Sequence, residues 1–272
     1  KGVEVSIAPC DREGRLDFEA FQKLFNERTK LVVMSHASNV SGTVLDAETA
    51  GKICKQKGVY FALDAAQSAG VIDIDFEKFS LSALCITGHK GLLGPQGIGA
   101  LLLTPKIAAE MEPLICGGTG SASHLITMPE FMPDKFEAGT LNLPGIIGLN
   151  AALRYIEERT PAEIRKHELE LAAQFIDGLQ SDTNIRIVGI RGKENRVGTV
   201  SLDFLEEDNA DIAYRLDAEY GIMTRCGLHC APLAHQTFGT FPQGTVRFAF
   251  GYQNTREDVN YALKAIHEMV RK

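Results

Sequence analysis

The feature that most constrains the fold is a lysine in a glycine-rich turn that directly follows an apolar run. The run covers residues 81–86, and residues 87–97 read Thr-Gly-His-Lys-Gly-Leu-Leu-Gly-Pro-Gln-Gly. A short apolar run bounded by a turn indicates a buried strand, and α/β folds build their sites at the carboxyl ends of such strands. We therefore expect Lys90 at a strand end, where partial burial lowers the pKa of an ammonium group. Such a lysine can form a Schiff base with a carbonyl, although a lysine in a turn is more often simply solvated.

A second apolar run, residues 60–63, ends in a carboxylate. Asp64 follows it directly, and Gln67 comes three residues later. Two neighbouring strand ends would thus bring a carboxylate, an amide and an amine to one crevice. Pyridoxal phosphate needs this set of groups: a lysine for its aldehyde, a carboxylate for its ring nitrogen and a donor near its ring oxygen. The combination of Asp64 with Lys90 indicates this cofactor more strongly than either residue alone.

Apolar runs alternate with helical patterns along the first half of the chain, which favours a mostly parallel sheet with crossover helices. The second half favours a smaller α+β domain, so we divide the chain into a cofactor-binding part, 1–155, and a small C-terminal part, 156–272. Strands are expected at 3–8, 31–35, 60–63, 81–86, 98–103, 185–188, 199–204 and 245–250. Helices are expected at 18–25, 47–57, 143–158, 164–179, 210–220 and 256–270.

Composition excludes several classes of partner. A net charge of −7 gives no basic footprint for nucleic acid. No apolar run approaches the ~18 residues that a membrane span requires. The six cysteines are scattered through 272 residues, which favours a reducing compartment over a disulfide framework. We expect a cytoplasmic protein with no nucleic-acid or membrane partner.

Five motifs in this order resemble the class V aminotransferase-fold enzymes, in particular their cysteine desulfurase and selenocysteine lyase branch. The resemblance covers the whole chain and implies a pyridoxal-phosphate enzyme of fold type I that acts as a homodimer. Members carry a longer segment ahead of residue 3, which supplies a histidine stacked on the cofactor ring and a hydroxyl residue for its phosphate. This sequence has neither in the expected place, so we expect an N-terminally truncated member. The motifs are residues 36–43, 64–67, 87–90, 136–140 and 225–232.

The resemblance implies a cofactor role for five residues. Lys90 would form the Schiff base and later move the proton at the substrate α-carbon. Asp64 would pair with the pyridine nitrogen, and Gln67 would donate to the ring oxygen. Thr87 and His89 would donate to the phosphate; many relatives have serine in place of Thr87, which preserves the hydroxyl.

Two further residues of these motifs are implied to lie near the cofactor. Asn39 would approach the ring oxygen and the substrate carboxylate, and it can also form a simple Asx turn. Thr140 would reach the phosphate of the neighbouring subunit, which implies a homodimer with shared sites. His36, in the same motif as Asn39, is interpreted as structural.

The last motif, residues 225–232, carries a cysteine between basic residues. An adjacent arginine and histidine can lower the pKa of a thiol and so yield more thiolate. By resemblance, Cys230 is the nucleophile that takes sulfur from the substrate and holds it as a persulfide. Arg247, inside an apolar run, resembles the clamp for the substrate α-carboxylate. Arg225 and His229 are expected near the same substrate.

The predicted activity is a pyridoxal-phosphate-dependent cysteine desulfurase, which converts L-cysteine to L-alanine and passes the sulfur to an acceptor protein. Selenocysteine lyase and class V aminotransferase or β-eliminating lyase activity are the alternatives on the same scaffold. Cys230 favours the desulfurase over a simple aminotransferase, which needs no thiol there.

Two alternatives of another class remain open. The first is a zinc-binding module, because two cysteines and two histidines lie within ten residues of one another and zinc accepts such ligands. The second is a non-catalytic fragment with a folded core. The candidate zinc ligands are Cys226, His229, Cys230 and His235.

Overall fold

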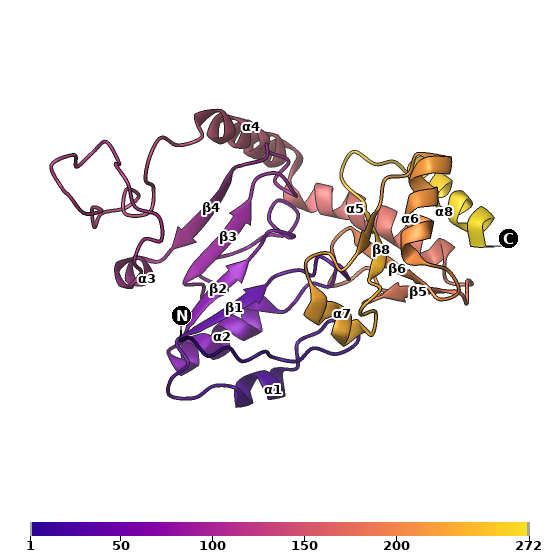
Figure 1. The fold of residues 1–272 in the computed structure, drawn as a ribbon, viewed down its shortest axis with the longest axis horizontal. Coiled ribbons are helices and arrows are strands. Elements are labelled where there is room, and N and C mark those ends of the chain that lie inside the picture. The colour runs from indigo at the N-terminus through magenta and orange to yellow at the C-terminus, as the bar shows by residue number, and fades with distance from the viewer. Residues whose placement is uncertain (1, 271–272) are drawn as a thin grey trace.

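The computed structural model describes residues 2–270 of the chain. It contains two four-stranded sheets, one built from the first half of the sequence and one from the second. Figure 1 shows the helix α5 (Pro161–Gly178) running from the first sheet towards the second. No helix among residues 2–270 is long and apolar enough to cross a membrane.

The first sheet has the strand order β1-β2-β3-β4. The first three strands are parallel, and β4 is antiparallel to β3. The predicted mostly parallel sheet and its four strand positions are confirmed, with ends that differ by one or two residues. The strands are β1 (Leu31–Ser35), β2 (Tyr60–Asp64), β3 (Ala83–Thr87) and β4 (Gly99–Leu103).

Four helices accompany this sheet. The helix α2 covers the residues that the sequence predicts, because the side chain of Asp46 accepts a hydrogen bond from the Thr49 amide and Gly58 ends the helix in the left-handed conformation. Residues 105–110 form a short helix that the sequence pattern did not reveal. The helices are α1 (Phe18–Lys23), α2 (Ala47–Lys57), α3 (Pro105–Glu110) and α4 (Leu143–Arg159).

The two faces of the first sheet differ sharply in burial. One face contributes Met34, Phe61 and Leu63 to a hydrophobic core. The opposite face leaves Val33 68% exposed and Leu101 46% exposed. Parallel sheets usually have both faces covered, and the apolar runs in the sequence predicted buried strands. Within residues 2–270, however, only one face of this sheet is covered.

The strand predicted at residues 3–8 is wrong. These residues pair with no other strand in the described part of the chain. Val3 is 80% exposed, and Val5 and Ile7 are exposed as well. An alternating pattern gives a strand only where a neighbour supplies the ladder hydrogen bonds, and the alternation here has no such neighbour.

The second sheet is antiparallel throughout and has the order β5-β6-β8-β7. The helices α5, α6 and α8 form a core with it that includes Phe175, Leu202 and Ile266. The three-residue β7 and the helix α7 are additions to the predicted elements. The remaining elements are β5 (Ile185–Val188), β6 (Thr199–Phe204), α6 (Asn209–Tyr220), β7 (Arg225–Gly227), α7 (Pro232–Phe238), β8 (Thr245–Ala249) and α8 (Arg256–Val270).

Each sheet has its own hydrophobic core, and the division into 1–155 and 156–272 stays a prediction. Ile164 of α5 packs in the first core, so the connecting helix serves both parts. A small cluster of Val40, Val188 and Phe238 joins the loop after β1 to the second sheet and α7. The two parts are therefore in direct contact next to the two segments that carry Asn39 and Cys230.

Candidate active site

The carboxyl ends of β1, β2 and β3 meet at one edge of the first sheet. Ser35 lies opposite Asp64, and Asp64 lies opposite Cys85. The backbone amide of His36 donates to the Asp64 carbonyl over 2.8 Å, and the Ala65 amide donates to the Cys85 carbonyl over 2.9 Å. Three neighbouring loops therefore leave the sheet side by side, and these loops with the strand ends before them carry the residues predicted to bind the cofactor, apart from Thr140.

Asp64 is the last residue of β2 and is half-buried. Its Oδ1 accepts a hydrogen bond of 2.9 Å from the Ala66 amide, which fixes the carboxylate at the start of the following turn. Because side chains alternate along a strand and paired residues share a face, Asp64 lies on the open face of the sheet together with Cys85. Gln67 lies one turn further on and is half-buried.

Two glycines hold the turn after Gln67 against the turn after Lys90. A Cβ added at Gly70 would lie 2.2 Å from the Gly91 carbonyl oxygen, and one added at Gly91 would lie 2.6 Å from that of Ala69. Both distances are shorter than any real contact, so only glycine allows the two backbones to approach this closely. The glycine-rich pattern thus brings the segment with Gln67 next to the segment with Lys90.

Lys90 itself lies in a tight turn. The Leu93 amide donates to the Lys90 carbonyl over 2.8 Å, and the Gly94 amide donates to the Gly88 carbonyl over 2.7 Å. The Lys90 side chain is exposed. The partial burial expected from the sequence is therefore absent within residues 2–270, because the sheet face next to this turn is uncovered.

Three other predicted cofactor residues differ in their surroundings. Thr87 ends β3 and is half-buried, whereas His89 is exposed beside Lys90. Thr140 is exposed in the segment between α3 and α4, which extends away from the sheet in Figure 1. Asn142, two residues later, donates from Nδ2 to the Gly97 carbonyl over 3.2 Å and so ties the start of α4 to the end of the Lys90 turn.

Cys230 lies in a backbone conformation that is unusual for its residue type. His229 has φ 50° and Cys230 has φ 60°, so two consecutive residues other than glycine are left-handed. Such a conformation costs about 1–2 kcal/mol per residue and persists only where its surroundings hold it. Cys230 is exposed, whereas the neighbouring Cys226 is half-buried in β7, and burial raises the pKa of the Cys226 thiol. Solvent therefore reaches Cys230, whereas Cys226 is partly covered.

Asn39 connects the thiol loop to the first sheet. Its Nδ2 donates to the His229 carbonyl over 2.6 Å, and its own carbonyl accepts a hydrogen bond of 3.0 Å from Arg247 Nη1. Three predicted site residues from distant parts of the sequence are therefore joined directly. The loop after β1 is anchored in turn by His36, whose buried Nδ1 lies 2.9 Å from Ser68 Oγ in the turn after β2.

Arg247 and Arg225 lie opposite each other on β8 and β7. Burial and the charge of Arg225 lower the pKa of the Arg247 guanidinium, and the nearby Cys230 sulfur raises it. Arg247 is half-buried and Arg225 is exposed. The pair provides positive charge beside Cys230, which suits both a thiolate and a substrate carboxylate.

His229 corrects part of the prediction from sequence. Its ring is buried and Nε2 lies 3.1 Å from Thr245 Oγ1, so the ring is turned into the protein and does not present itself to a substrate. Burial first, and then the charges of Arg247 and its neighbours, lower the pKa of His229 to about 4. The residue is neutral near pH 7, so the arginines and not this histidine supply the positive charge expected next to Cys230.

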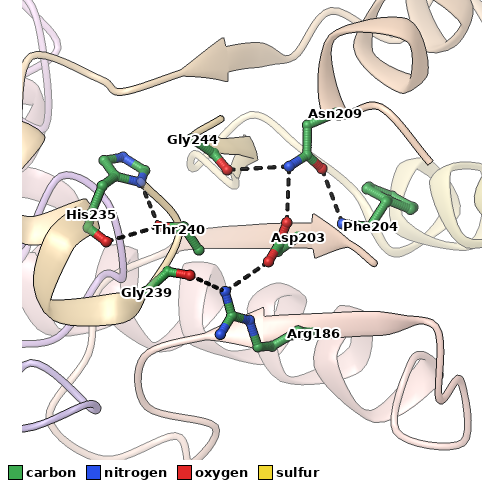
Figure 2. Close-up of polar contacts among 8 residues, drawn as sticks. All are labelled: Arg186, Asp203, Phe204, Asn209, His235, Gly239, Thr240 and Gly244. Atoms are coloured by element: carbon green, nitrogen blue, oxygen red, sulfur yellow. Dashed lines mark hydrogen bonds and ion pairs between the residues drawn. The ribbon is translucent and has the colours of Figure 1, made fainter. Parts of the chain in front are cut away.

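A polar network that the sequence did not reveal supports the segment between α7 and β8 (Figure 2). Arg186 donates to Asp203 over 2.7 Å and to the Gly239 carbonyl over 3.1 Å. Asn209 donates to Asp203 over 2.9 Å and to the Gly244 carbonyl over 3.1 Å. This network fixes both ends of the connection that follows Cys230 and α7.

The zinc alternative gains no support from the geometry. Within residues 2–270, no three side chains of histidine, cysteine, aspartate or glutamate lie close enough to hold a metal ion. The four candidate ligands do not converge on one point, since Cys226 lies in β7 and the His229 ring is turned towards Thr245.

A family model described as "Aminotransferase class-V" matches residues 1–262. The chain belongs to the class-V aminotransferase family. A probable cysteine desulfurase from Pyrococcus abyssi is 36% identical over 276 residues, which cover 100% of this chain and 67% of that protein. A probable cysteine desulfurase from Methanothermobacter thermautotrophicus is 34% identical, with 99% of this chain and 68% of that protein covered.

Solved structures agree with the family assignment. The apo cysteine desulfurase from Thermococcus onnurineus NA1 superposes with a TM-score of 0.90 at 34% identity, covering 99% of this chain and 67% of that one. The cysteine desulfurase CsdA from Escherichia coli, solved as an S-sulfonic acid, gives a TM-score of 0.84 at 28% identity, covering 94% of this chain and 62% of that one. The predicted fold type I class is confirmed. The chain spans about two thirds of the length of these relatives.

Proposed function

We propose that this chain acts as a pyridoxal-phosphate-dependent cysteine desulfurase, with L-cysteine as substrate and Cys230 as the residue that accepts the sulfur. The observation that carries the proposal is the Asn39 bridge. It ties the exposed Cys230 loop and Arg247 to the sheet edge where Asp64 and Lys90 follow neighbouring strand ends. An aminotransferase has no need of a thiol held in this position.

The residues at the sheet edge fit the cofactor by their chemistry. Asp64 offers a carboxylate for the ring nitrogen, Lys90 an amine for the aldehyde, and Gln67 an amide for the ring oxygen. Thr87 and His89 offer donors for the phosphate. When bound, the cofactor supplies an electron-withdrawing ring that stabilises negative charge at the substrate α-carbon.

The side chains then divide the chemistry among themselves. Arg247, assisted by Arg225 and Asn39, binds and orients the substrate carboxylate. The amine of Lys90 removes the proton from the α-carbon. The thiolate of Cys230 forms a bond with the substrate sulfur as the carbon–sulfur bond breaks, and the electron pair of that bond stays with carbon, which is protonated. Atoms balance: L-cysteine and the Cys230 thiol give L-alanine and a Cys230 persulfide, which an acceptor protein then takes up.

We also infer a homodimer in which Thr140 reaches the phosphate bound by the partner copy. Large apolar side chains are exposed along the segment that carries Thr140, and apolar patches of this kind mark protein interfaces. They are Leu114, Ile115, Leu125, Ile126, Phe131 and Met132. A cytoplasmic location remains part of the proposal, as the six cysteines suggest.

The test compares three forms of the protein, each loaded with pyridoxal phosphate: wild type, Lys90→Ala and Cys230→Ala. We expect wild type to release alanine from L-cysteine in the presence of a thiol reductant, and both variants to lose this activity. Parallel assays with selenocysteine and with an amino acid plus a keto acid address the lyase and aminotransferase alternatives. Full alanine release by Cys230→Ala would contradict the proposed role of the thiol, and transamination that needs Lys90 but not Cys230 would identify an aminotransferase.

A further inference from the structure

Two buried histidine rings lie close to the Cys230 thiol in the chain, one in the left-handed turn itself and one in α7, which follows it. His229 is 5% exposed and His235, in α7, is 0% exposed. Their ring centroids are 5.5 Å apart and their planes are tilted by 47°. Figure 2 shows His235 beside Thr240, whose Oγ1 lies 2.7 Å from His235 Nδ1. Each ring therefore has one nitrogen bound to a threonine hydroxyl: His229 to Thr245 and His235 to Thr240.

The second nitrogen of each ring makes no well-formed hydrogen bond in the described part of the chain, although the Leu228 carbonyl lies near enough to His235 to raise its pKa. His229 Nδ1 and His235 Nε2 are both buried without a hydrogen bond among residues 2–270. A buried polar atom without a partner is costly, so such atoms in a native structure call for an explanation. The two rings make no direct hydrogen bond to each other within residues 2–270, and one water molecule between them satisfies both atoms if one ring donates and the other accepts.

The charges around the pair favour this arrangement. Burial lowers the pKa of both rings, and Arg247 on β8 and Arg225 on β7 lower that of His229 further. Asp203 on β6 and the Leu228 carbonyl raise the pKa of His235. A neutral imidazole has one donor and one acceptor, and two neutral rings can therefore form a complementary pair.

The pair bears on Cys230 through the backbone. The left-handed conformation of His229 and Cys230 needs support from outside the turn. Asn39 holds the His229 carbonyl, and Thr245 holds one side of its ring. The His235 ring lies beside it at a centroid distance of 5.5 Å, and the His235 backbone amide donates to the Ala231 carbonyl over 3.2 Å, directly after the turn.

We propose that His235 is a positioning residue, whose buried imidazole pairs with that of His229 and so holds the left-handed turn that presents the Cys230 thiol. This inference rests on the proposed function of Cys230 as the sulfur acceptor. His235 acts through His229 and touches neither the substrate nor the cofactor.

The experiment measures the rate at which iodoacetamide alkylates Cys230 at pH 7, located by peptide mass spectrometry, together with kcat and KM for L-cysteine. His235→Phe keeps the bulk of the ring but removes both nitrogens. Thr240→Val keeps the shape of the threonine side chain but removes the hydroxyl that orients the His235 ring. His235→Gln returns a polar end. His267→Gln, on α8, is the control because His267 pairs with Asp182 far from the thiol loop.

We expect His235→Phe to alkylate about tenfold more slowly and to lose about tenfold in kcat, the effect of roughly one lost buried hydrogen bond. KM should stay within about twofold, because the proposed carboxylate clamp at Arg247 is untouched. A lower kcat with an unchanged KM is not what a general loss of stability would give. Thr240→Val should show a smaller change in the same direction, His235→Gln should recover part of the rate, and His267→Gln should match wild type.

A folded His235→Phe that alkylates and turns over like wild type would overturn the proposal. Should that variant fail to fold, Thr240→Val decides in its place, and wild-type alkylation and kcat there would overturn the proposal equally. The proposed function fails separately, if wild type alkylates readily at Cys230 but never gains sulfur from L-cysteine. In that case a slowed His235→Phe would still support the positioning role.

Discussion

Replacing His36 by glutamine tests the interpretation of this residue as a buried neutral anchor of the loop that carries Asn39. His36 is 3% exposed, and its Nδ1 lies 2.9 Å from Ser68 Oγ. Its ring packs edge-on against Phe79 at a centroid distance of 5.7 Å. Burial, followed by the charge of Arg165, lowers the pKa of His36 from 6.5 to about 4.

The sign and size of the effect follow from this shift. The unfolded chain binds a proton at His36 as the pH falls below 6.5, whereas the folded chain binds it only near pH 4. The free energy of unfolding therefore decreases as the pH falls through this window. Between pH 7 and pH 5 the loss from His36 alone amounts to about 2 kcal/mol. Glutamine keeps an acceptor for the Ser68 hydroxyl but has no proton to bind, so His36→Gln abolishes this loss.

The assay is urea unfolding of wild type and His36→Gln at pH 7 and at pH 5. Other titrating groups are common to both proteins and cancel in the difference between their free energies of unfolding. We expect that difference to move by about 2 kcal/mol in favour of the variant on going to pH 5. His124→Gln, at an exposed histidine, is the matched control and should show no such movement. A difference that is the same at both pH values would refute the reasoning.

Two further predictions concern a carboxyl group in α5 and the close glycine contact beside the Lys90 turn. Burial raises the pKa of Glu168 from 4.5 to about 7, so the folded chain loses stability as the pH rises through this window. The gain in free energy of unfolding from Glu168→Gln should therefore be about 2 kcal/mol larger at pH 8 than at pH 5, measured by urea unfolding. An equal gain at both pH values would count against the raised pKa. Gly70→Ala should destabilise the protein by several kcal/mol in thermal unfolding, because its Cβ would lie 2.2 Å from the Gly91 carbonyl oxygen. The control is Gly58→Ala, which is also at positive φ but has nothing within 4 Å of its Cβ, and it should cost only about 1 kcal/mol. Similar losses for the two variants would show that the turn after Lys90 does not depend on this close approach.

Elements with strong local signals could be predicted from the sequence. The helix at 47–57 is bounded by Asp46 and Gly58, and both ends lie where expected. The placing of Asp64 and Lys90 after adjacent parallel strands followed from apolar runs that end in polar residues. Local patterns of this kind depend on hydrogen bonds and burial within a few residues, and a sequence displays them directly.

Features that depend on distant partners could not be predicted. The bond from Asn39 to His229 joins residues 190 positions apart, and no local pattern signals it. The inward turn of the His229 ring depends on Thr245 in another strand. The alternation at residues 3–8 suggested a strand, but alternation describes one strand only and not the neighbour that must pair with it.

The central claim is that Cys230 takes sulfur from L-cysteine with the help of Lys90. The most direct measurement is the mass of the peptide that contains Cys230, after brief exposure of the cofactor-loaded protein to L-cysteine without reductant. The account predicts the added mass of one sulfur atom on Cys230 in wild type and none in Lys90→Ala. An unmodified Cys230 in a protein that releases alanine, or sulfur found on another cysteine, would contradict it.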